Sequence, residues 1–113
     1  MTIETTEHTR EASQLVPMAE ALLALSSTFG NLPVPYVTIT RGEPELGLLT
    51  DAVADFELWR AALLIAPAAV ELVNSGPNAW LAVDGFAHGV PVHLTCHAIA
   101  LPVEVDENAQ VAA

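Results

Sequence analysis

The chain has 113 residues, of which 52% are hydrophobic and 15% are charged, and its 14 acidic residues face 3 basic ones for a net charge of −11. This balance predicts one folded domain rather than a disordered chain. It also excludes direct binding to nucleic acid phosphates or anionic membranes, because no basic patch can be assembled.

The apolar content is higher than a domain of this size can bury, so we expect an apolar surface patch. The simplest use of such a patch is self-association as a homo-oligomer, most simply a dimer. Cys96 is the single cysteine, which excludes an internal disulfide framework. The first residues lack the basic and apolar regions of a secretory signal, and we expect a cytoplasmic protein.

The N-terminal part of the chain predicts a tail followed by a helix. Residues 1–12 are polar and aperiodic, and are expected to be a disordered acidic tail. A helix is predicted from Ser13, its expected N-cap, to Gly30, with Pro17 in the first turn. Its apolar stripe consists of Leu15, Met18, Leu22, Leu25 and Phe29.

A β-hairpin is predicted next. Residues 35–40 and 45–50 alternate apolar and polar side chains around a turn at 41–44. Pairing Thr40 with Glu45 places Ile39 opposite Leu46, so that the two apolar faces agree.

A second helix is expected after Thr50 and Asp51, residue types that favour the N-cap of a helix. We expect it to end before Pro67. Its apolar stripe includes Phe56 and Trp59, and the latter is expected in the core.

The last part predicts a short strand near residues 70–72, a turn at 74–78, and two strands at 79–87 and 90–99. A two-residue turn at His88 and Gly89 joins the last two strands. One face of this hairpin pairs Val83 with Leu94 and Leu81 with Cys96, and the other pairs Asp84 with His93, Ala82 with Thr95, and Trp80 with His97. A competing turn at residues 84–85 leaves a shorter ladder. Residues 103–113 are expected to form a second disordered acidic tail.

The predicted fold is a single α+β domain over residues 13–102, with element order α-β-β-α-β-β-β. We expect an antiparallel sheet of about five strands with two helices on one face. The opposite face should carry mixed polar and aromatic residues and form a partner interface. The residues expected there are Tyr36, Thr38, Trp80, His93, Thr95 and His97.

No catalytic, cofactor-binding or metal site is predicted. His93, Cys96 and His97 have side chains of the kinds that bind metal ions. On a strand, however, Cys96 points away from the two histidines. The histidines would lie about 13 Å apart, too far for one zinc ion. Asp84 and His93 could form part of a catalytic relay, but no Ser or Thr is placed to act as its nucleophile. We therefore expect a cross-strand ion pair between them.

Residues 55–63, which contain a Phe-x-x-Trp helix, and the Gly-Val-Pro-Val sequence at 89–92 resemble short uncharacterised proteins of actinobacteria and their phages. The resemblance covers residues 32–98 and implies no activity and no functional residues. It leaves open an origin in a phage or mobile element.

Three hypotheses of function follow. The leading one is a non-enzymatic, self-associating protein-interaction module, which includes a role as an accessory or host-modulating protein of a phage or mobile element. The alternatives are an acidic inhibitor that occupies a nucleic-acid-binding site of another protein, and a small-molecule or metal-binding domain.

Overall fold

A computed structural model of the chain describes residues 11–39 and 44–97. Residues 1–10 of the first predicted tail, the whole of the second tail, most of the first hairpin turn and the predicted end of the last strand lie outside these residues, while Ala12, predicted in the first tail, begins η1. The elements, in chain order, are η1 (Ala12–Leu15), α2 (Val16–Thr28), β1 (Tyr36–Ile39), β2 (Leu46–Thr50), α3 (Val53–Ala62), η2 (Pro67–Ala69), β3 (Glu71–Ser75), β4 (Asn78–Ala87) and β5 (Val90–Cys96).

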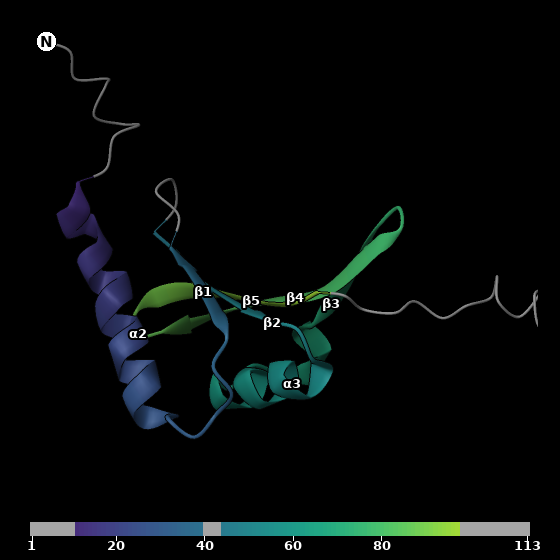
Figure 1. Ribbon diagram of the computed structural model, residues 1–113, viewed down its shortest axis with the longest axis horizontal. Helices are drawn as coiled ribbons and strands as arrows, with labels where there is room; N and C mark the ends of the chain where they lie inside the picture. Colours follow the sequence, from purple (N-terminus) through teal and green to yellow (C-terminus); the bar gives the residue numbers. More distant parts are fainter. Residues whose placement is uncertain (1–10, 40–43, 98–113) are drawn as a thin grey trace, which may run out of the picture.

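The predicted α+β class and element order are confirmed, but the sheet is mixed rather than antiparallel. Its five strands follow the order β1-β2-β5-β4-β3, and β2 runs parallel to β5. The chain leaves β2 through α3, which lies under the sheet, and returns by the β3-β4-β5 meander (Figure 1). The last strand, β5, therefore lies at the centre of the sheet. Its neighbour β2 is separated from it in the chain by α3, η2, β3 and β4.

Both predicted hairpin registers are confirmed. Ile39 pairs with Leu46 in the first hairpin, and Ala87 pairs with Val90 in the second. His88 and Gly89 both adopt positive φ, 51° and 76°, as a two-residue hairpin turn of the favoured hand requires.

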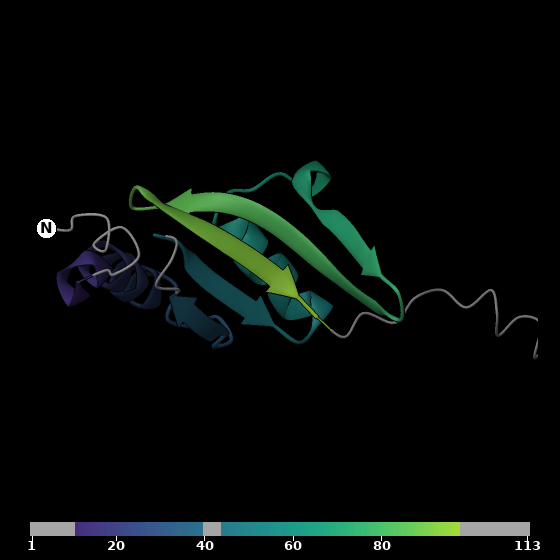
Figure 2. The same ribbon diagram turned by 90° about the horizontal axis from the view of Figure 1, so that it is seen from above.

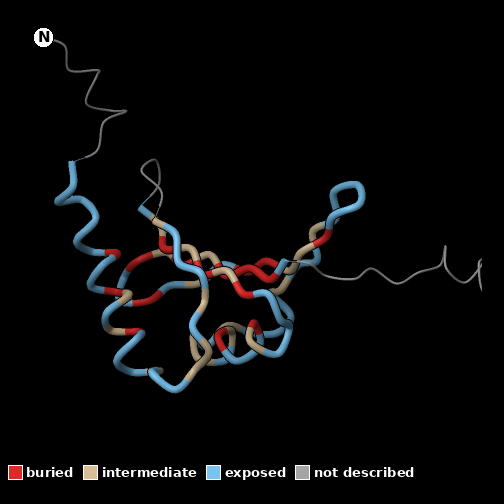
Figure 3. The backbone as a smooth tube through the Cα atoms, viewed as in Figure 1, coloured by how far each residue is buried: buried red, intermediate tan, exposed pale blue. Residues whose placement is uncertain are grey.

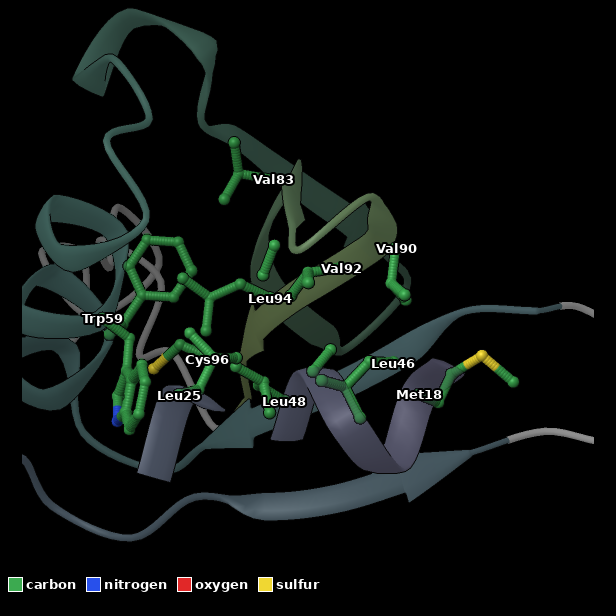
Figure 4. Packing of buried hydrophobic residues seen from close by; sticks show 13 residues of the cluster. Met18, Leu25, Leu46, Leu48, Trp59, Val83, Val90, Val92, Leu94 and Cys96 are labelled. Carbon is green, nitrogen blue, oxygen red and sulfur yellow. The ribbon is translucent and has the colours of Figure 1, made fainter. Parts of the chain in front are cut away.

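The core lies between one face of the sheet and the two helices. Phe56, Leu46 and Leu94 are fully buried, and Trp59 is 5% exposed as predicted. The sticks in Figure 4 show α2 residues Met18 and Leu25 packed beside the inward residues of β2. In Figure 3 buried residues recur along β2, β4 and β5 between less buried ones, while much of each helix is exposed. This packing follows from the helical stripes and from the alternation in the strands.

Both predicted helix caps are wrong. Ser13 lies inside η1, and the backbone N–H of Glu11 donates to Gln14 Oε1 at its start. The N-cap of α3 is Ala52, because Thr50 is buried in β2, where its hydroxyl donates to the carbonyl of Thr95. Because the Thr50 hydroxyl is bonded within the sheet, Thr50 does not cap α3.

No helix within the described residues is both long enough and apolar enough to cross a membrane.

Candidate functional site on the open face of the sheet

The sheet face away from α3 is not covered by any described segment, and Figure 2 looks onto it with α3 behind. We call it the open face. The strand registers place on it, from the β1 edge to the β3 edge, Tyr36, Thr38, Gly47, Leu49, Pro91, His93, Thr95, Ala82, Asp84, Phe86, Trp80, Glu71 and Val73.

Aromatic and apolar side chains lie across one half of the open face, which we call the aromatic half: Tyr36, Leu49, Val73, Trp80 and His97. The Trp80 and His97 rings stack with centroids 5.5 Å apart and an interplanar angle of 8°. Tyr36 is 64% exposed on the outer strand β1. Such side chains, apolar in body and polar at the tip, are common anchors of protein interfaces.

Phe86 is a further exposed ring on the open face, near the β4–β5 turn and separated from Trp80 by Ala82 and Asp84 on the same face of β4. It pairs with Pro91 and is 71% exposed, although a phenylalanine loses free energy by remaining in water. An exposed ring of this size indicates a second apolar spot on the open face, apart from the aromatic half.

The other half of the open face carries a cluster of three ligand-type side chains, which we call the acidic cluster: Glu45, Asp84 and His93. His93 Nδ1 lies 2.6 Å from Asp84 Oδ1, which confirms the expected cross-strand pair. One ligand atom from each of the three residues lies within 4.8 Å of the other two.

A shallow hollow of about 390 Å³ separates the aromatic residues from the acidic cluster. Trp80 and Val73 line one side of it, and Asp84 and His93 line the other, with Glu71 at the β3 edge. The hollow combines an aromatic wall with carboxylates and an imidazole, a mixture suited to a small polar ligand or a hydrated ion.

A second hollow, of about 330 Å³, lies on the helix side of the sheet between α2, β1 and α3. Its wall is formed chiefly by apolar residues such as Leu22, Phe29, Val37 and Trp59. None of the residues that line it has a titratable side chain, so this hollow lacks groups that could bind a charged ligand or transfer a proton.

Of the residues predicted for the open face, all except Thr95 lie at an accessible place on it: Tyr36, Thr38, Trp80, His93 and His97. Thr95 lies on that face but is only 8% exposed. Its neighbours on the adjacent strands are Leu49 and Ala82. Because Thr95 is buried between them, its side chain is hardly accessible to a partner.

Cys96 is fully buried in the core and faces away from His93, as the strand alternation predicts. The sequence pattern His93-x-x-Cys96-His97 therefore does not bring its three side chains to one metal.

Sequence reasoning missed Glu45 and Phe86. Glu45 joins Asp84 and His93 only because β2 and β5 are parallel neighbours, and no local pattern reports that pairing. Phe86 could have been found, because the predicted register already placed it on the mixed face.

Comparisons of the chain with protein-family models, with curated proteins and with solved structures found no match. The resemblance to short actinobacterial and actinophage proteins stays a prediction.

Proposed function

We propose that this protein is a non-enzymatic interaction module that docks a second copy of itself on the aromatic half of the open face. The observation that carries the proposal is a sheet face on which Tyr36 is 64% exposed and the Trp80 and His97 rings stack, while the opposite face is packed against α3. Two sheets can pack face to face through such side chains at a spacing of about 10 Å.

The size of the face fits a small dimer interface. Five strands about 4.8 Å apart, each contributing about six residues of about 3.3 Å, span about 500 Å². Two copies that meet over the whole open face would bury about 1,000 Å² together, just below the range of standard specific interfaces, and the aromatic half alone accounts for about half of that area.

The distribution of charge supports the same orientation. Glu45 and Asp84 lie toward the end of the face near the β4–β5 turn, and Glu71 lies at the β3 edge beside Val73. With the aromatic half at the centre of the contact, these carboxylates stay at a solvated rim and like charges of two copies remain apart.

The proposal includes a cytoplasmic location, in keeping with the single cysteine. An accessory or host-modulating role in a phage or mobile element would add a second partner, which could use whatever surface the dimer leaves free.

The test is the absolute mass in solution, measured by light scattering after size exclusion over a range of protein concentrations. We expect a dimer whose dissociation constant rises at least about tenfold in Trp80→Ala and in Tyr36→Ala, since aromatic anchors dominate interface energies. The matched control is Leu23→Ala, because Leu23 is an exposed apolar residue on α2, 68% accessible and away from the open face.

A wild-type chain that stays monomeric at every concentration would overturn the proposal. So would a dimer that Leu23→Ala weakens as much as Trp80→Ala does. Retained circular dichroism of each variant shows that the fold is intact.

A further inference from the structure

We propose that Glu45, Asp84 and His93 bind one divalent transition metal ion of the zinc type. This inference does not depend on self-association. It assigns metal coordination to the acidic cluster, a property that the aromatic half does not have.

The first argument is geometric. One ligand atom from each residue lies within 4.8 Å of the other two. Ligands at about 2.0–2.2 Å from a zinc ion are themselves about 3–4 Å apart, so small side-chain rotations would complete the coordination. The three residues form the acidic cluster without any movement of the backbone.

The second argument is that the sheet holds the ligands in register. Asp84 and His93 are direct partners on β4 and β5. Glu45 directly precedes Leu46, which pairs with Val92 beside His93. Two of the three ligands therefore lie on paired strands, which position side chains more firmly than a loop does, and Glu45 lies one residue before β2.

The third argument concerns charge. Two carboxylates lie close together in a chain of net charge −11. Arg60 is the one Lys or Arg side chain in the described ranges, and it is bound on α3 by Glu57 and by the carbonyl of Ile65. A bound metal ion would offset the charge of the two carboxylates.

The donor set selects the class of metal. An imidazole nitrogen with two carboxylate oxygens suits zinc and similar first-row ions, whereas calcium and magnesium prefer oxygen ligands alone. Because Asp84 and His93 border the hollow of about 390 Å³, the metal would keep at least one position open to water.

The experiment uses the full chain, stripped with a chelator and titrated with zinc chloride by calorimetry. We expect one ion per chain in the wild type. His93→Ala and Glu45→Gln should each weaken binding by about tenfold or more, at least as much as loss of an outer-shell partner does. Replacing zinc with cobalt should give visible absorption bands that both variants lose.

Matched controls are His97→Ala and Glu71→Gln, which remove a histidine and a carboxylate from the same face but outside the acidic cluster. Both should bind zinc as the wild type does. Trp80→Ala should also keep zinc binding even if it loses self-association, so the two proposals can fail separately.

Three results would overturn the site: no zinc bound at millimolar concentration, binding that His93→Ala and Glu45→Gln leave unchanged, or equal loss in His97→Ala. Because the side chains of His93 and Asp84 are 41% and 77% exposed, substitutions at this cluster should leave the fold intact, which circular dichroism checks.

Discussion

At the scale of single residues, Trp59 links three parts of the molecule. Its indole N–H donates to the carbonyl of Pro33 at 2.8 Å, and its ring meets Phe29 edge to face at 6.3 Å. The side chain therefore joins α3 to α2 and to the segment that leads into β1. An aromatic ring that also satisfies a backbone carbonyl fixes the entry of the first strand.

We expect Trp59→Phe to lower the free energy of unfolding by about 1 kcal/mol, because the ring is largely kept while the hydrogen bond is lost. Denaturant unfolding, at protein concentrations below those that favour association, measures the change. Leu58→Ala is the control on the same helix, since Leu58 is 47% exposed and should change stability by less than about 0.5 kcal/mol. Equal stability of Trp59→Phe and wild type would show that the Pro33 bond contributes nothing.

At the scale of elements, the end of α3 has the hydrogen bonds of a Schellman motif but not its usual residue. The N–H of Ile65 donates to the carbonyl of Arg60, and the N–H of Leu64 to that of Ala61. Leu64 has φ of 60°, a left-handed conformation that glycine adopts without steric cost. Its side chain is 92% exposed, so no burial compensates for the strain.

Leu64→Gly should therefore raise the free energy of unfolding by about 1 kcal/mol. Leu64→Ala is the matched control, because alanine keeps the Cβ atom that causes the strain and should bring little gain. Thermal unfolding of the three proteins compares them directly. A glycine variant no more stable than the alanine variant would contradict the left-handed conformation at this position.

At the scale of the whole molecule, the dominant property is the net charge of −11. Like charges repel more strongly in the compact chain than in the unfolded one, so the charge opposes folding and also opposes association of two copies. The docking proposed here therefore has to rely on apolar contacts, which salt does not screen.

Raising sodium chloride from about 0.01 M to about 1 M shortens the Debye length from ~30 Å to ~3 Å. We expect the melting temperature to rise with salt and self-association to be maintained or strengthened. Potassium chloride at equal ionic strength should act alike, because screening depends on ionic strength. Association that weakens steeply with salt would instead favour the acidic-inhibitor hypothesis, in which the charge itself makes the contacts.

Much of this molecule was predictable from local patterns. The helical stripes placed Phe56 and Trp59 in the core, and strand alternation with the His88–Gly89 turn predicted the register that pairs Asp84 with His93. These features depend on residues within one helix or one hairpin, where periodicity and turn chemistry carry the information.

Only the tertiary structure decided that β5 lies between β4 and β2, parallel to the latter. That pairing places Glu45 beside His93 across more than forty residues of sequence, and it buries Thr50 in the sheet instead of leaving it to cap α3. The choice of neighbour depends on how distant apolar faces cover one another in the core, and no local propensity encodes it. The sequence by itself thus determined the elements, their faces and the Asp84–His93 and Trp80–His97 neighbours, while the position of Glu45 beside Asp84 and His93 was decided only in the folded sheet.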